Sequence, residues 1–274
     1  MSEEQSTLLL RLAGPLQSWG ASSEFNRRDT QPRPTKSGVV GLLAAAHGRP
    51  RDADISDLAG LKLAVRVDHA GSLLRDYHTA SDYRGNPLLS AQVNAKGIQK
   101  ATSPAKPTYV TQRYYLQDAV FVAAVQGPVG LLDTLAHAIR NPAFPLALGR
   151  RSCVPSKPVY LASPSDLNPH QGLEETLRAV PWQAGEHARD AYRHRARHPE
   201  VVDLSVTIDD ETGEDTADDV PTSFAPGARA RTARQIRHTW ISVPTGLTAP
   251  HDRQTSAVGH TQDDNHDPFA LLGW

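Results

Sequence analysis

Apolar positions in the first 70 residues predict a strand, a helix and a second strand. Residues 7–12 form a short apolar run that a Gly-Pro pair ends, which is typical of a strand. Thr35 or Ser37 is placed to cap a helix whose apolar residues span 39–46. Residues 61–67 then alternate between apolar and polar side chains, so we expect a second strand there.

The same order of elements is predicted again further along the chain. Residues 118–125 are a compact apolar strand, and residues 130–140 carry apolar side chains on one face of a helix. Residues 148–161 contain a Gly-Arg-Arg turn followed by another strand. Strand, helix, strand, long excursion, strand, helix, strand is the order of a ferredoxin-like βαββαβ layer, so the predicted fold class is α+β.

The excursion at about 75–115 has a composition of its own. It is poor in aliphatic residues, rich in Gly, Ser, Thr, Asn and Lys, and far longer than an ordinary connection. Five of the seven tyrosines fall within it. A long insertion with basic and aromatic residues is typical of a segment that extends from its domain and binds a ligand. The alternative is a partly disordered loop.

The remainder of the chain predicts a second, smaller region. Residues 1–163 form the first domain, and residues 164–244 contain a short helix and two strands, which predicts a small β-rich region. An acidic loop at 209–219 holds seven carboxylates and is expected to be solvated. Residues 245–274 are polar and His-rich, which is typical of a flexible tail.

Charge is divided unequally between these regions although the net charge is only −1. Residues 1–163 hold 19 Lys and Arg against 12 Asp and Glu, and the rest holds 10 against 18. This asymmetry favours a polyanionic partner for the first region. Chance segregation of solvated surface charge is the alternative.

The sequence also excludes several classes of site. Cys153 is the only cysteine, so an internal disulfide and a cysteine-based metal site are excluded. The chain has no phosphate-binding Gly-x-x-x-x-Gly-Lys-Ser/Thr loop, no Gly-x-Ser-x-Gly motif and no His-Glu-x-x-His motif. We therefore expect no metal and no cofactor. No apolar run is long enough for a membrane helix and no signal peptide precedes the first strand, so a cytoplasmic protein is expected.

Two basic clusters are candidates for phosphate binding. The first lies before and at the start of the first predicted helix, where free backbone N–H groups favour anions, and consists of Arg27, Arg28, Arg33 and Lys36. The second is the turn Gly149, Arg150, Arg151 and Ser152. With the tyrosine-rich excursion they predict a groove for single-stranded RNA.

A catalytic alternative remains open at this point. Asp76, Tyr77 and His78 could support metal-independent RNA cleavage by activating a 2′-hydroxyl group. The third group of such a site would be one of three lysines, Lys96, Lys100 and Lys106.

Four blocks of sequence resemble the CasD family, a subunit of type I-E CRISPR Cascade that binds the 5′ handle of the guide RNA. They are residues 10–20 (LRLAGPLQSWG), 34–43 (PTKSGVVGLL), 74–79 (LRDYHT) with 82–85 (DYRG), and 148–153 (LGRRSC). The blocks occur in order over residues 8–160, and the resemblance fades after residue 161.

The resemblance implies a RAMP-type, RRM-like core whose excursion is a thumb that packs over the guide RNA where the handle meets the spacer. It also implies a non-catalytic role, because a separate subunit, CasE, cuts the precursor RNA in type I-E systems. The I-C relatives do cleave RNA, so an endoribonuclease stays the alternative. The implied partners are the crRNA 5′ handle, the CasC backbone subunits and the CasA large subunit, with target DNA contacted only indirectly.

The same resemblance assigns roles to individual residues. Phosphate contacts are expected from Arg28, Lys36, Ser37, Arg150, Arg151 and Ser152. The base of the thumb is expected to contribute Arg75, Tyr77, His78, Tyr83, Arg84 and Arg113. Trp19 is expected to belong to the core.

Overall fold

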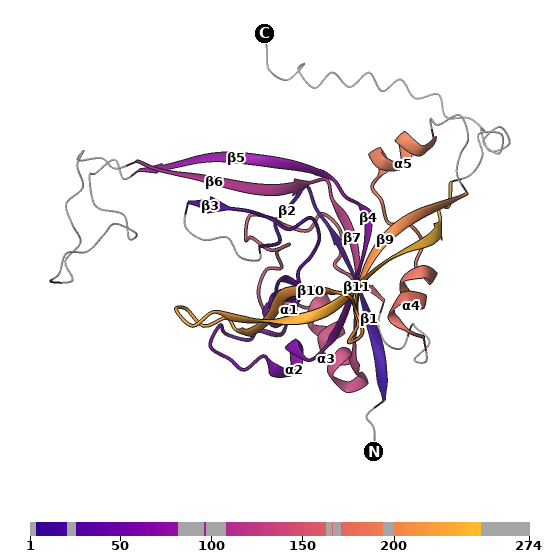
Figure 1. The fold of residues 1–274 in the computed structure, drawn as a ribbon, viewed down its shortest axis with the longest axis horizontal. Helices are drawn as coiled ribbons and strands as arrows, with labels where there is room; N and C mark the ends of the chain where they lie inside the picture. Colours follow the sequence, from indigo (N-terminus) through magenta and orange to yellow (C-terminus); the bar gives the residue numbers. More distant parts are fainter. Residues whose placement is uncertain are drawn as a thin grey trace, which may run out of the picture.

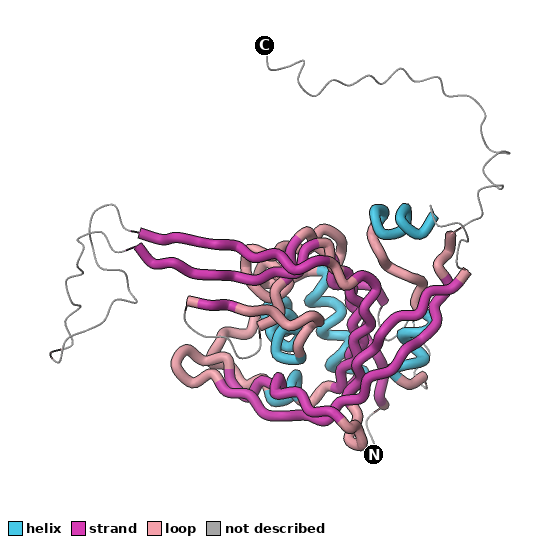
Figure 2. The backbone as a smooth tube through the Cα atoms, turned by 45° about the horizontal axis from the view of Figure 1, so that its top comes forward, coloured by secondary structure: helices cyan, strands magenta, loops and turns pink. Residues whose placement is uncertain are grey.

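The chain folds into a sheet-rich α/β structure with few helices (Figure 1). The computed structural model describes residues 4–20, 26–81, 96, 108–162, 166, 171–193 and 200–247. Within these residues a seven-stranded sheet forms the body, and a smaller sheet carries a long hairpin that projects from it (Figure 2). Among the same residues, no helix is long and apolar enough to cross a bilayer.

The predicted order of strands and helices in the first 163 residues is present. The elements are β1 (Gln5–Ala13), α1 (Lys36–His47), α2 (Ser56–Ala59), β4 (Lys62–His69), β7 (Val120–Pro128), α3 (Val129–Arg140) and β8 (Tyr160–Ala162). In the sheet the neighbours run β4-β7-β1-β8, and every one of these pairings is antiparallel. The two strand–helix–strand units therefore interleave, with β7 lying between β4 and β1.

The strands bury side chains on both faces of this sheet. On one face Leu8, Leu10 and Phe121 pack against α1 and α3. On the other face Leu9 and Val122, one position along each strand, pack against α4 (Leu173–Ala179) and the segment that leads to α5 (Glu186–Arg193). Each fully buried side chain of this kind contributes about 1.5–3 kcal/mol, so both faces hold the sheet in place.

A buried ion pair fixes the segment after α4 against the sheet. The Arg66 and Asp68 side chains are fully buried and bond at 2.7 Å. The Arg66 guanidinium also donates to the carbonyl oxygens of Val180 at 2.7 Å and Pro181 at 3.1 Å, just beyond the end of α4. The Trp182 indole N–H donates to the Asp68 carbonyl oxygen at 2.9 Å. Every buried charge here is satisfied, as burial requires.

The strands after residue 200 extend the first sheet. They are β9 (Val201–Asp209), β10 (Asp215–Ser223) and β11 (Ala230–Pro244), and the complete order is β10-β11-β9-β4-β7-β1-β8. The predicted strands at 201–208 and 236–243 are present, but they have no sheet of their own, because β9 pairs with β4. The boundary predicted after residue 163 and the tail from 248 onward lie outside the described residues.

The structure corrects the prediction of a solvated acidic loop at 209–219. Residues 215–219 lie in β10. The side chains of Asp209 and Asp219 are only 11% and 7% exposed, and both form ion pairs with Arg234. The β10–β11 hairpin folds over α1 and brings cations to these acids, which the local sequence does not reveal.

The two ends of the predicted excursion pair with one another and form a hairpin. β5 (Ser72–Ser81) and β6 (Thr108–Gln117) pair antiparallel from Ser72 opposite Gln117 to Ser81 opposite Thr108 (Figure 1). The other edge of β6 pairs with β2 (Leu16–Gln17) and β3 (Arg27–Arg28). The alternative of a disordered loop is therefore wrong for 72–81 and 108–117, and residues 82–95 and 97–107 lie outside the described residues.

Candidate nucleic-acid interface

The loop after β1 anchors the base of the β5–β6 hairpin. Trp19 is fully buried, as predicted, and its indole N–H donates to the Gln17 side-chain oxygen at 3.1 Å. The Gln17 amide donates in turn to the carbonyl oxygens of Leu12 at 3.0 Å and Ala119 at 2.6 Å. The Ser18 hydroxyl donates to the Tyr114 carbonyl oxygen at 3.1 Å, so this loop holds β6 against the body.

The Gly-Arg-Arg turn packs against the same loop. Gly149 has a φ of 90°, and a Cβ atom there would overlap the Ser18 carbonyl oxygen, so glycine is required. The Arg150 guanidinium donates to the carbonyl oxygens of Arg28 at 2.7 Å and Tyr114 at 3.2 Å. It also lies over the Tyr115 ring, 4.8 Å from the ring centre. Arg150 thus joins β3, β6 and the turn.

The predicted thumb-base residues divide between two faces of the hairpin, because side chains alternate along a strand. Arg75 and Tyr77 of β5 lie on one face with Tyr114 of β6. Arg27 joins this face, with its guanidinium 5.2 Å from the centre of the Tyr114 ring. Tyr77 is 62% exposed, so an aromatic ring is available to a ligand. We call this the tyrosine face.

The opposite face of the hairpin gathers cations, and we call it the arginine face. Arg113 of β6 is the register partner of Arg28 in β3, and His78 follows on β5. Arg150 lies on this face through its contact with Tyr115. Arg151 and Ser152 are exposed in the adjoining turn. Four of the predicted RNA-binding residues therefore lie on this face, and they are Arg28, His78, Arg113 and Arg150.

Arg113 has an unusual environment. It is half-buried, and its Nε atom is fully buried with no acceptor among the described residues. Two arginines opposite one another in neighbouring strands repel, and Asp76 on the other side of Arg113 forms no ion pair with it in the described part of the chain. An anion that lies over the two arginines would reduce this repulsion.

The start of α1 has the opposite character. Thr35 is the N-cap, and its hydroxyl accepts from the Gly38 N–H at 3.2 Å. The Lys36 N–H donates to the Asp219 carboxylate at 2.7 Å, and the Lys36 ammonium group binds Asp209 at 2.9 Å. A carboxylate of the chain itself thus occupies the anion position that a helix start offers.

Arg234 completes this cluster by binding both carboxylates. We call these four residues, Lys36, Asp209, Asp219 and Arg234, the charge ring. Burial, with Arg234 nearby, lowers the pKa of Lys36 to about 8, and burial lowers the pKa of Arg234 to about 10. Burial raises the pKa of Asp219, although the Lys36 N–H opposes this.

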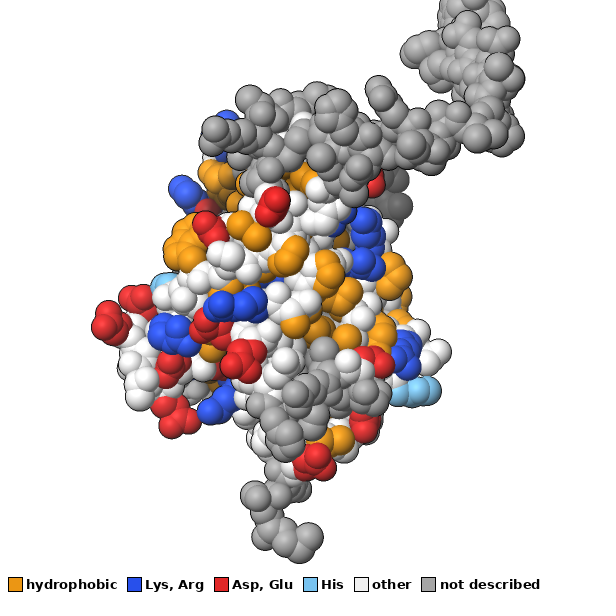
Figure 3. Space-filling view, turned by 90° about the vertical axis from the view of Figure 1, so that its right-hand side faces the viewer, with side chains coloured by type: hydrophobic (Ala, Val, Ile, Leu, Met, Phe, Trp, Pro, Cys, Tyr) orange, Lys and Arg blue, Asp and Glu red, His pale blue; other side chains and the backbone are white. Residues whose placement is uncertain are grey.

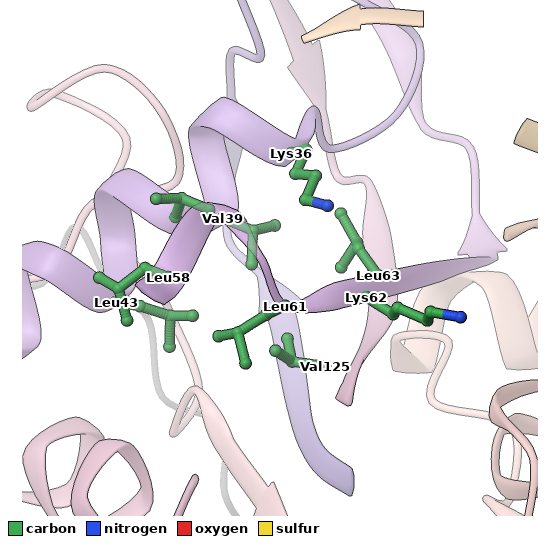
Figure 4. Close-up of a pocket in the computed structure, with 9 residues that line it drawn as sticks. Lys36, Val39, Leu43, Leu58, Leu61, Lys62, Leu63 and Val125 are labelled. Carbon is green, nitrogen blue, oxygen red and sulfur yellow. The ribbon is translucent and has the colours of Figure 1, made fainter. Parts of the chain in front are cut away.

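Figure 4 shows the Lys36 side chain running from the start of the helix toward Leu63, beside an apolar cavity of about 10 Å³. The Lys36 and Ser37 residues are 7% and 6% exposed. These two predicted phosphate ligands therefore lie inside the protein and away from the hairpin faces.

A groove of about 450 Å³ lies between the segment after β3 and the β10–β11 hairpin. Arg33 lines it, donates to the Thr207 hydroxyl and lies 2.9 Å from the His238 Nδ1 atom. Burial and the nearby Arg33 charge lower the pKa of His238. Asp215 and Asp218 line the same groove, so its charge is mixed.

Two of the groups proposed for RNA cleavage, Tyr77 and His78, do not converge. Tyr77 and His78 are neighbours in β5, so their side chains point to opposite faces of the hairpin. Lys100 and Lys106 lie outside the described residues, as do Tyr83 and Arg84. In the described ranges, no group of three or more His, Cys, Asp or Glu side chains is placed to hold a metal ion.

The face over α4 and α5 provides a contrast. Figure 3 shows Lys and Arg side chains lying among Asp and Glu side chains there. Arg178 binds Glu174 at 3.0 Å, and Arg237 binds Asp210 at 2.9 Å.

The pairing of Arg28 with Arg113 in the sheet was not predictable from sequence, because β3 is too short to carry a pattern.

Comparison with known protein sequences identifies the family of this chain. The sequence profile of a family described as CRISPR-associated protein (Cas_Cas5) matches residues 7–238. The chain belongs to the Cas5 family. A relative from Escherichia coli (strain K12), the CRISPR system Cascade subunit CasD, is 34% identical over 184 residues, which are 62% of this chain and 76% of that protein. The predicted resemblance to the CasD family is confirmed.

Two solved structures have the same Cas5-type fold. A chain from a CRISPR RNA-guided surveillance complex has a TM-score of 0.69 and 36% identity, and the match covers 91% of this chain and 96% of that one. A second match, the crystal structure of a Cas protein, has a TM-score of 0.61 and 40% identity, with 88% and 98% covered.

Proposed function

We propose that this Cas5 protein is a non-catalytic subunit of a CRISPR RNA-guided surveillance complex and that it binds the 5′ handle of the guide RNA. The observation that carries the proposal is the arginine face, where Arg113 lies opposite Arg28 in the neighbouring strand and Arg150 lies beside them. Phosphate groups of the RNA backbone neutralise these charges. The relative named as a Cascade subunit supports the assignment to the complex.

The fold supports the same proposal. The order β4-β7-β1-β8, with antiparallel pairing throughout and α1 and α3 on one face, supports our proposal of a ferredoxin-like core. We propose that this core is of the RAMP type and that the β5–β6 hairpin is the base of a thumb. The hairpin begins at the edge where β2, β3 and the Gly-Arg-Arg turn meet. The contacts there fix its two faces relative to the body of the protein.

The two faces suggest how the hairpin handles a single strand. The arginine face neutralises phosphates, which gives affinity without base preference. The tyrosine face offers Tyr77 as a stacking surface for a base. A hairpin with these two faces can separate one nucleotide from its neighbours at the end of the handle. The proposed protein partners are the CasC backbone and the CasA large subunit, with target DNA contacted only indirectly.

The decisive experiment incubates the purified full-length chain with repeat RNA in the absence of metal ions. A binding subunit retards the RNA intact, and its affinity falls steeply as salt rises, because phosphate contacts release counterions. Discrete cleavage products would overturn the non-catalytic assignment. Intact RNA that is not retarded at low salt would overturn direct RNA binding.

A variant of the Gly-Arg-Arg turn tests the location. Arg151→Ala removes an exposed charge, so it should weaken RNA binding and leave the fold unchanged. Arg150→Ala should also loosen β3, because Arg150 bonds to the backbone there. Arg178→Ala on α4 is the matched control and should bind RNA like the unaltered protein. Equal affinity of all three variants would place the interface elsewhere.

A further inference from the structure

The β10–β11 hairpin ends in a segment with unusual charge. Residues 220–233 contain no Asp or Glu, and Arg229 and Arg231 are the charged side chains within them. Both arginines are exposed, and Arg231 lies near enough to Asp219 to lower the pKa of that carboxyl group. The cations nearer the root of the hairpin differ, since Arg234 and Arg237 each bind carboxylates.

This hairpin is held firmly at its root. The charge ring joins β10 and β11 to the start of α1. Farther along, the Phe224 ring packs on the main core, 3.6 Å from the position that a Cβ atom on Gly41 would take. The segment beyond Phe224 is exposed, and we call it the arm. The arm therefore presents two arginines at the end of a well-anchored hairpin.

The arm points in an informative direction. Figures 1 and 2 both show its free end on the side of the molecule toward which β5, β6 and β3 project. The groove lined by Asp215 and Asp218 separates the arm's root from the segment after β3. A polyanion on the arginine face would therefore lie on the same side of the molecule as the arm's free end.

The two arginines lie close together in the chain at the end of the hairpin. Arg231 belongs to β11, and Arg229 directly precedes the first residue of that strand. The residues between and beside them are Ala228, Ala230 and Thr232, whose small side chains let a backbone approach closely.

We propose that Arg229 and Arg231 form a second, separate contact with the phosphate backbone of a nucleic acid. For guide RNA, the inference rests on the proposed function and extends it to a part of the chain outside the hairpin faces. Target DNA offers the same phosphate chemistry, and binding assays with each nucleic acid distinguish the two sources.

The test compares two double variants of the full-length chain that change the net charge equally. Arg229→Ala/Arg231→Ala alters the arm, and Arg178→Ala/Arg193→Ala alters an exposed arginine on α4 and a partly buried arginine on α5. Affinities for labelled oligouridine RNA and for labelled double-stranded DNA are measured over a range of salt. Loss of two phosphate contacts should lower the slope of log affinity against log salt by about 1.4 for the RNA or about 1.8 for the DNA.

The outcomes separate cleanly. A fall for RNA identifies RNA as the ligand of the arm, and a fall for DNA alone identifies DNA. No fall with either probe, or an equal fall in the α4–α5 control, overturns the inference. Arg229→Lys/Arg231→Lys keeps the charge and should restore the slope, which separates charge from folding. Arg113→Ala serves as the reference: if it leaves RNA binding intact while the arm variant weakens it, the proposed location on the arginine face fails and the arm contact stands. If the unaltered protein cleaves the RNA or does not bind it, the proposed function fails.

Discussion

The start of α1 and the arginine face of the hairpin both gather basic residues, yet they have opposite electrostatic character. At α1, Lys36 and Arg234 are buried against Asp209 and Asp219. On the hairpin, Arg113 faces Arg28, and the Arg113 Nε atom has no acceptor among the described residues. The first cluster is internally neutral and stabilises the fold. We propose that the second cluster binds phosphate, because Asp76, the register partner of Arg113 on β5, forms no ion pair with it.

The largest expected effect comes from breaking the charge ring. Asp219→Ala leaves Arg234 and the Lys36 N–H without one of their acceptors, which should lower the free energy of unfolding by about 3 kcal/mol. Urea denaturation measures this change. Asp218→Ala, at an exposed neighbour, should change it by less than about 0.5 kcal/mol. Similar stability of the two variants would contradict a structural role for the ring.

The next effect concerns RNA affinity. Arg113→Ala removes a charge-assisted contact, so the dissociation constant for repeat RNA should rise about tenfold, which corresponds to about 1.4 kcal/mol. Lys36→Met at the charge ring should leave the affinity of folded protein unchanged. Fluorescence anisotropy at fixed salt compares the two. If Lys36→Met weakens binding as much as Arg113→Ala, the distinction between the clusters is wrong.

A smaller effect is expected on the tyrosine face. Tyr77→Ala removes an exposed stacking surface worth about 1 kcal/mol, so RNA affinity should fall about fivefold. Tyr77→Phe retains the ring and should bind like the unaltered protein. Equal loss in both variants would point to the hydroxyl group, and no loss in either would remove the tyrosine face from the interface.

The smallest effect is a pH dependence at the groove. Burial and Arg33 hold the pKa of His238 below its usual value of about 6.5, so the folded state disfavours the imidazolium form. The unfolded chain therefore binds the proton more readily, and stability should fall as pH drops below about 6.5. His238→Gln should flatten this part of the profile. An unchanged profile would mean that His238 titrates alike in both states.

The sequence predicted the core well because its elements carry clear patterns. The runs at 7–12 and 118–125 became β1 and β7, and Thr35 is the helix cap that was expected. β5 and β6 were not predicted as strands, because their exposed faces hold Arg, Tyr and His and thus no apolar alternation. Their stability comes instead from pairing with one another and with β2 and β3.

The clustering of basic residues was predicted in part, and distance along the chain explains the difference. Arg28, Arg113 and Arg150 lie close together, and their role in RNA binding stays a prediction. Lys36 has the same local sequence signals, but its N–H group meets Asp219 from 183 residues away. A local pattern cannot show which carboxylates tertiary folding will bring to a lysine. For that reason the predicted groups at the helix start and on the hairpin looked equivalent.

The junction between β4 and β9 sets a limit on how this protein can be shortened. If the chain were cut near residue 200, β4 would lose its neighbour and present a row of unpaired backbone groups at an open edge. The face formed by Leu9 and Val122 would lose part of its cover at the same time. Such a fragment should self-associate through strand addition, so a minimal soluble version of the protein must retain the last three strands.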